Sequence, residues 1–101
     1  MEGSAVPEEL RRLRAEIDQI DDDIIQLLGK RFDVTRQVGL LKAEKQLNSV
    51  DPERERQKLE HLRQQAEALS LNPEFVLSLF GTLFAEVVSN HKRFLAARQE
   101  K

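Results

Sequence analysis

Three ionisable side chains occupy helical positions that are otherwise apolar. In the first half of the chain, aliphatic residues recur at alternating steps of three and four, and Arg31 takes one of these positions. Glu55 and His91 take comparable positions in two later stripes. A guanidinium keeps its charge, and burying one unpaired is costly, so Arg31 requires an anion nearby. Three such residues together indicate a polar pocket inside a helical bundle.

The stripes that carry these residues have the spacing of amphipathic helices. The first consists of Leu10, Leu13, Ile17, Ile20, Ile24, Leu27, Arg31, Val34, Val38 and Leu41. The second consists of Glu55, Leu59, Leu62, Ala66 and Leu69, and the third of Phe80, Phe84, Val87, His91 and Leu95. For any one of the three polar residues, the alternative is a structural ion pair or a hydrogen-bonded core histidine.

Further charges lie close to these positions in helical register. Arg31 and Lys42 are eleven residues apart, about three turns or 16 Å on one face, so both cations can converge on one anion. Asp51 and Glu55 also share a face, with Arg54 beside them. Taken alone, Lys42 and Arg54 fit a solvated face. Taken together, these residues predict a small, polyanionic, hydroxylated ligand.

The elements that position these residues are three helices. The first is expected from Pro7 to about Lys45, since proline suits a first turn. Asp51-Pro52 and Asn72-Pro73 each read as an N-cap followed by proline, and the helices they start are expected to reach Leu69 and Arg98. Alternation with period two is absent, so the sequence predicts an all-α fold in a single domain spanning 1–101, with ordered helices over about 7–98.

Composition excludes several classes of function. The chain has 101 residues, no cysteine, two histidines and a net charge of −2. Thiol chemistry and a zinc site are therefore not expected, and neither is binding to nucleic acid. We expect no cofactor and no metal. Without a signal peptide or a membrane-spanning segment in the sequence, the expected localisation is cytoplasmic, with no membrane partner.

The length of the first helix predicts an assembly. A helix of about 38 residues is about 57 Å long, whereas a compact globule of this size is roughly 33 Å across. The two shorter helices cannot cover the whole first stripe, which leaves its start at Leu10, Leu13, Ile17 and Ile20 uncovered. A second copy of the chain would cover it, so we expect an intertwined helical homodimer.

An ordered set of motifs resembles the all-helical chorismate mutase family along nearly the whole chain. The motifs are Leu13-Arg14-x-x-Ile17-Asp18-x-Ile20-Asp21, Leu27-Leu28-x-x-Arg31, Val38-Gly39-x-x-Lys42, Asp51-x-x-Arg54-Glu55-x-x-x-Leu59 and Leu79-Phe80. The resemblance implies three-helix chains that form intertwined dimers. It also implies the Claisen rearrangement of chorismate to prephenate, without metal or cofactor, in aromatic amino-acid biosynthesis by the shikimate pathway.

The resemblance further implies roles for individual residues. Arg14, from the second chain of the dimer, and Arg31 would hold the substrate carboxylates. Lys42 would contact the ether oxygen and a carboxylate, and Arg54 would line the same pocket. The residues implied as partners of the ring hydroxyl are Asp51 and Glu55.

Two positions depart from the family pattern. The second donor to the ether oxygen is usually glutamine or glutamate, and here it is His91; one turn earlier a small polar residue is usual, and here it is Val87. These departures keep other readings open. On the same fold they are isochorismate pyruvate lyase and a mutase for 4-amino-4-deoxychorismate. Outside enzymes, the alternative is a non-catalytic helical dimerisation module. The acids at Asp51 and Glu55 favour chorismate mutase.

Overall fold

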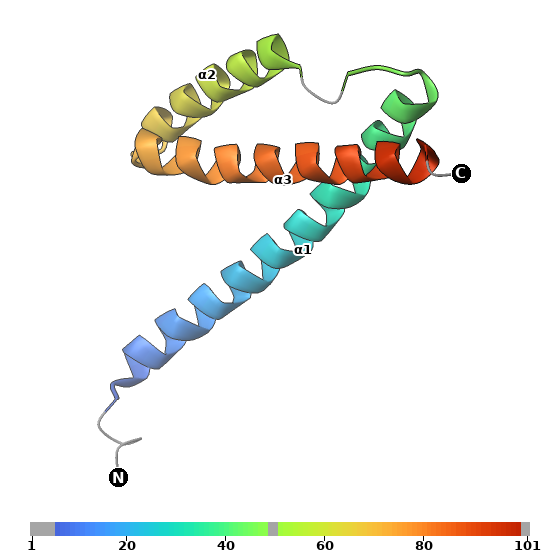
Figure 1. Ribbon diagram of the computed structural model, residues 1–101. Helices are drawn as coiled ribbons and strands as arrows, with labels where there is room; N and C mark the ends of the chain where they lie inside the picture. Colours follow the sequence, from blue (N-terminus) through green and yellow to red (C-terminus); the bar gives the residue numbers. More distant parts are fainter. Residues whose placement is uncertain (1–5, 49–50, 100–101) are drawn as a thin grey trace. The chain divides into compact units, whose positions relative to one another are not determined.

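The chain forms three α-helices in a computed structural model that describes residues 6–48 and 51–99. The helices are α1 (Glu8–Glu44), α2 (Pro52–Ala68) and α3 (Pro73–Gln99), and the described residues contain no strand (Figure 1). This confirms the all-α prediction and the long first helix. The helix bounds agree with the predicted ones to within a residue or so, because proline and capping residues mark the starts so clearly.

The starts of α2 and α3 are fixed by side-chain caps. Asp51 Oδ1 accepts a hydrogen bond of 3.1 Å from the backbone N–H of Arg54, and Pro52 follows in the first turn of α2. At α3, Asn72 Oδ1 accepts from the backbone N–H of Glu74 at 3.0 Å. Each cap satisfies one of the N–H groups that a helix leaves without an intrahelical partner.

The ends of α1 and α2 share one backbone device. Gln46 and Ser70 have positive φ values of 59° and 60°. After each of these residues the chain folds back, so that Leu47 N donates to Lys42 O at 2.7 Å and Leu71 N donates to Ala66 O at 2.8 Å. Both arrangements are Schellman motifs, which satisfy carbonyl groups at a helix end. Neither uses the glycine that this conformation favours.

The contacts of the chain separate it into two compact units, 1–33 and 34–101, with the boundary inside α1. In the first unit, every residue from Glu8 to Leu27 is exposed. The exposed residues include the predicted apolar stripe, with Ile17 at 54%, Ile20 at 56% and Leu27 at 62%. This helical segment therefore buries none of its stripe over 8–27 within the single chain.

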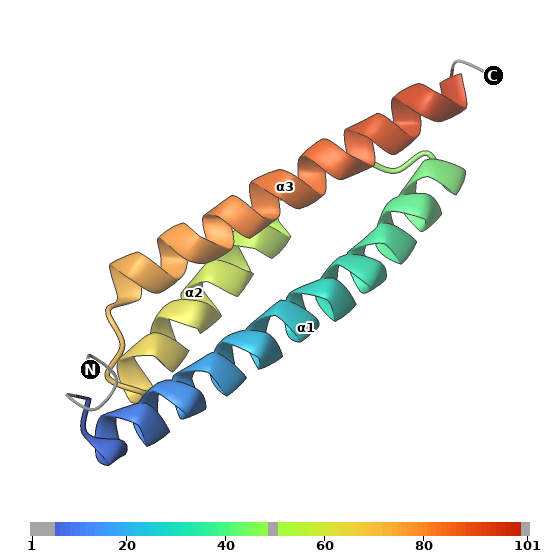
Figure 2. The ribbon, with the colours of Figure 1, turned by 90° about the horizontal axis from the view of Figure 1, so that it is seen from below.

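The second unit is built on a helical hairpin. α2 and α3 contact each other on either side of a short turn, and they diverge away from that turn in Figure 1, to which Figure 2 gives the perpendicular view. Leu62 and Ala66 of α2 are buried, 6% and 2% exposed. The rings of Phe80 and Phe84 on α3 pack edge to face with centroids 6.3 Å apart. These residues follow the predicted stripes, so the hairpin core agrees with the helical periodicity.

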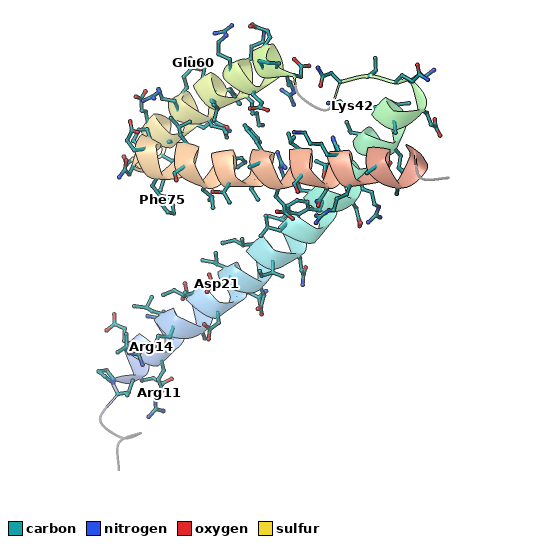
Figure 3. All side chains as sticks on the ribbon, in the orientation of Figure 1. Arg11, Arg14, Asp21, Lys42, Glu60 and Phe75 are labelled. Atoms are coloured by element: carbon teal, nitrogen blue, oxygen red, sulfur yellow. The ribbon has the colours of Figure 1, made fainter. Side chains whose placement is uncertain are left out.

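Four stripe residues of the second unit depart from the expected burial: Val34, Val38 and Leu41 of α1 are 52%, 40% and 51% exposed, and the fourth lies at the end of α2. Leu69 is 70% exposed, because it is the C-cap residue of α2 and the chain turns away from the helix there. Phe75, labelled in Figure 3 at the start of α3, is exposed as well. Across the hairpin, the Arg63 and Glu74 side chains approach to 4.0 Å, an exposed pair that adds little stability.

The described helices include none that is both long enough and apolar enough to cross a membrane.

Candidate active site

The last turns of α1 carry the predicted cation Lys42. Its side chain is half-buried, while the neighbouring Gly39 and Ala43 are buried. The carbonyl oxygen of Lys42 accepts the 2.7 Å hydrogen bond of the Schellman motif. The helix therefore ends in a defined conformation two residues after this lysine, at Glu44. A cation in the last turn also interacts favourably with the negative end of the helix dipole.

His91 of α3 packs directly against this part of α1. The side chain is buried, 4% exposed, and its Nε2 lies 2.9 Å from the Thr35 carbonyl oxygen. A Cβ atom built on Gly39 would lie only 2.4 Å from His91 Cδ2. The imidazole thus occupies space that any side chain at position 39 would need.

The second ring nitrogen of His91 has a different environment. Nδ1 is buried and has no hydrogen-bond partner among the described residues. Buried polar atoms without partners are uncommon in folded proteins. The predicted third-stripe histidine is therefore buried with one ring nitrogen hydrogen-bonded and the other without a partner among the described residues.

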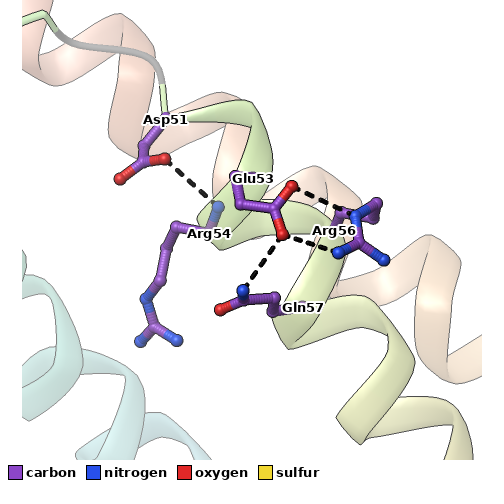
Figure 4. A network of polar contacts seen from close by, with 5 residues as sticks. All are labelled: Asp51, Glu53, Arg54, Arg56 and Gln57. Atoms are coloured by element: carbon purple, nitrogen blue, oxygen red, sulfur yellow. Dashed lines mark hydrogen bonds and ion pairs between the residues drawn. The ribbon is translucent and has the colours of Figure 1, made fainter.

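The start of α2 brings two other predicted residues together. The Asp51 carboxylate caps the helix by accepting from Arg54 N, so one of its oxygens is already engaged. In Figure 4 the Arg54 side chain points away from the neighbouring surface cluster of Glu53, Arg56 and Gln57. Both Asp51 and Arg54 are exposed, which leaves the remaining Asp51 oxygen and the guanidinium accessible to a ligand.

The surface cluster beside them is a local ion pair. Arg56 Nη2 lies 2.6 Å from Glu53 Oε2, and Gln57 donates to the same oxygen at 3.0 Å. The Arg56 hydrogen bond, helped by Gln57, holds the pKa of Glu53 below its usual value. The cluster thereby keeps Glu53 and Arg56 occupied with each other.

The remaining predicted residues divide between the two units. Glu55 on α2 and Val87 on α3 are half-buried members of the second unit. Arg14, exposed (Figure 3), and Arg31, half-buried, belong to the first unit. In the structure, His91 thus packs against the α1 segment that carries Lys42, and the Asp51 side chain accepts a hydrogen bond from the backbone of Arg54. That the first-unit arginines join them stays a prediction, as do the individual roles.

Sequence reasoning missed Thr35 and Gly39 as neighbours of His91. A signal was present, because Thr35, Gly39 and Lys42 follow one another at steps of four and three and so share a face of α1. A glycine inside a helix is unfavourable by about 1 kcal/mol relative to alanine, and a close approach by another group is one reason for a glycine such as Gly39 to occur there.

The described residues contain no group of His, Cys, Asp or Glu side chains arranged to hold a metal ion. What they do offer is a half-buried lysine near the end of α1 and, separately, carboxylates at the start of α2. Groups of these kinds can bind an anionic, hydroxylated small molecule.

Comparison with known proteins points to one family. The family described as chorismate mutase type II matches residues 13–92. The chain is 33% identical over 87 residues to a "T-protein" from Haemophilus influenzae, covering 86% of the chain and 23% of that protein. It is 36% identical over 84 residues to a "Bifunctional chorismate mutase/prephenate dehydratase" from Aquifex aeolicus, covering 83% of the chain and 20% of that protein.

A third relative has a similar length. It is a "Chorismate mutase" from Methanocaldococcus jannaschii, 26% identical over 94 residues, which are 93% of the chain and 95% of that protein. In contrast, the chain spans about a fifth to a quarter of the T-protein and bifunctional relatives it matches.

Proposed function

Because the chain belongs to the chorismate mutase type II family, we propose that it catalyses the Claisen rearrangement of chorismate to prephenate in aromatic amino-acid biosynthesis. One observation carries the proposal. The matched stretch, 13–92, contains every candidate site residue from Arg14 to His91. The half-buried Lys42 beside the α1–α3 contact supports it, since a positioned cation is what this reaction needs.

The reaction requires positioning and charge stabilisation rather than proton transfer. The substrate side chain must fold over the ring, and holding its two carboxylates at a fixed separation selects that conformer. We assign this task to Arg31 and to the partner's Arg14. As the carbon–oxygen bond breaks, negative charge grows on the ether oxygen, and Lys42 stabilises it more in the transition state than in the ground state.

The other residues complete the pocket. Arg54, at the start of α2, adds a cation toward the anionic substrate. Asp51 and Glu55 accept from the ring hydroxyl, for which Asp51 keeps one carboxylate oxygen beyond its capping bond. Val87 and His91 form the α3 wall.

We further propose that the working form is an intertwined homodimer. The aliphatic stripe of α1 is exposed from Leu10 to Leu27 in the single chain, and a stripe of this length in water favours association. Arg14 and Arg31 are seventeen residues apart, about 25 Å along one helix, so one chain cannot place both on a ligand of about 10 Å. In a two-fold dimer the partner's Arg14 supplies the missing cation.

Enzyme assay tests the activity directly. Loss of chorismate absorbance should depend on the protein, and the product should be prephenate. Lys42→Ala should lower kcat by roughly 10²-fold, the scale for losing one preorganised donor. The exposed Lys45 is a matched control, and Lys45→Ala should leave kcat unchanged.

Other products would indicate a different function. Salicylate and pyruvate from isochorismate would identify a lyase on this fold, and turnover of 4-amino-4-deoxychorismate alone would identify a mutase for the amino analogue. A folded dimer that turns over none of these substrates would be a dimerisation module.

A further inference from the structure

We propose that His91 is a positioning residue, held by the Thr35 carbonyl in one neutral tautomer with its hydrogen on Nε2, so that neutral His91 keeps no N–H for a ligand. The tautomer follows from the geometry of α1 and α3. Its consequence for Lys42 rests on the proposed mutase function.

The tautomer is set by the chemistry of the contact. His91 Nε2 lies 2.9 Å from Thr35 O. A carbonyl oxygen can only accept a hydrogen bond, so the ring nitrogen must donate. A neutral imidazole has a single N–H, and the other nitrogen then holds a lone pair. Nδ1 of neutral His91 can therefore accept a hydrogen bond but cannot donate one to an ether oxygen.

The glycine on α1 makes this contact possible. A Cβ at position 39 would lie 2.4 Å from Cδ2 and 2.8 Å from Nε2 of the ring, both shorter than any real Cβ contact. Thr35 and Gly39 are one helical turn apart, so the ring lies over the backbone between them. With 4% of His91 exposed, the ring is confined on this surface and cannot turn Nε2 toward a ligand without leaving Thr35.

The consequence concerns the lysine one turn further on. Gly39 and Lys42 are three residues apart on α1 and so lie on the same side of the helix. The His91–Thr35 hydrogen bond links this side of α1 to α3, and the Schellman motif fixes the backbone just after Lys42. His91 thereby holds the base of the Lys42 side chain in place, and it acts on the reaction through that lysine.

Nitrogen NMR of the full-length, ¹⁵N-labelled protein tests the tautomer. Long-range proton–nitrogen correlations distinguish Nε2–H from Nδ1–H rings and from mixtures of the two. The chain has one other histidine, the exposed His61. In the His61→Gln variant, the only histidine ring signals are therefore those of His91. We expect a single Nε2–H tautomer for neutral His91. An Nδ1–H ring, or rapid averaging between tautomers, would overturn the proposal.

Addition of prephenate, the proposed product, extends the test to the bound state. A positioning role predicts that His91 stays in the Nε2–H form when prephenate binds. Conversion of the ring to the doubly protonated form on binding would make His91 a donor to the ligand instead. Failure of prephenate to bind would contradict the proposed mutase function. The tautomer measured in the free protein would still test the assignment of His91.

Kinetics of two substitutions test the action through Lys42. His91→Phe keeps a ring but has no donor for Thr35, and kcat should fall about tenfold with a smaller change in KM. His91→Gln restores an N–H donor and should return kcat to within about threefold of the native value. Native kcat in His91→Phe, or a Gln variant as impaired as the Phe variant, would contradict the positioning role.

Discussion

Replacing Gly39 by alanine should destabilise the protein, although alanine is the better helix former. In an open helical position the change would add stability, by about 1 kcal/mol. Here the new Cβ would meet the His91 ring at 2.4 Å, so the buried ring must move. Overpacking of this kind costs about 1–3 kcal/mol, and losing the His91–Thr35 hydrogen bond costs about 1 kcal/mol more.

The net expectation for Gly39→Ala is a loss of about 1–3 kcal/mol. For a chain of this size each kcal/mol corresponds to a shift in Tm of about 4–8 °C. Thermal or urea unfolding at matched protein concentration measures it, since association would make Tm depend on concentration.

The sign of the effect should depend on His91. In a His91→Ala background the ring is absent, and Gly39→Ala should then stabilise by about 1 kcal/mol, as helix propensity alone dictates. Gly29 is the matched control on the same helix, because a Cβ there meets nothing within 4 Å. Gly29→Ala should stabilise in both backgrounds. If Gly39→Ala behaves like Gly29→Ala in the native background, the packing described for His91 is refuted.

Three further outcomes are expected. Mixing Arg14→Ala with Arg31→Ala protein and allowing subunit exchange should restore about a quarter of native activity. About half the dimers become mixed, and each mixed dimer then has one native site. If the exchanged mixtures are no more active than their components, a shared site is excluded. Ser70→Gly should stabilise by about 1 kcal/mol in urea unfolding, because Ser70 has a φ of 60°, and no gain over Ser70→Ala would contradict this. The pKa of Glu53 is lowered by its arginine hydrogen bond, so its contribution is present above the usual pKa and lost as the pH falls through the folded value. Glu53→Gln should therefore lower Tm at neutral pH and leave it unchanged near about pH 2, whereas an equal difference at both would exclude the ionised carboxylate as the cause.

Local sequence signals were sufficient to predict the helices. Asp51 and Asn72 were identified as caps from their type and the prolines that follow, and each accepts the expected backbone N–H. Such signals act over a few residues, so they do not depend on the rest of the fold. Leu62 and Ala66 were likewise predicted as core from periodicity alone.

Contacts between helices could be predicted only in part. The position of His91 on an apolar stripe indicated burial, which is confirmed. Its partner could not be predicted, because a backbone carbonyl such as that of Thr35 is present at every residue, so sequence does not mark the one that is used. The exposure of Leu69 was missed because the apolar spacing in the sequence continues beyond the residue at which the helix ends.

The positive-φ positions were not predicted either. Gln46 and Ser70 carry side chains that disfavour a positive φ, so their residue types did not indicate this conformation. That conformation lets the chain fold back at each helix end, and the backbone hydrogen bonds formed there offset part of its cost.

The helix end after Lys42 has a consequence for how this chain tolerates changes in length. The bond from Leu47 N to Lys42 O closes within six residues, so the geometry of the lysine is settled before the connection to α2 begins. Lengthening a connecting segment costs little in loop entropy, about 0.6 kcal/mol per doubling. Insertions after Asn48 should therefore be nearly neutral for the lysine, whereas a single-residue deletion between Lys42 and Leu47 would remove the helix end itself. Natural length variation is expected to accumulate on the far side of that boundary.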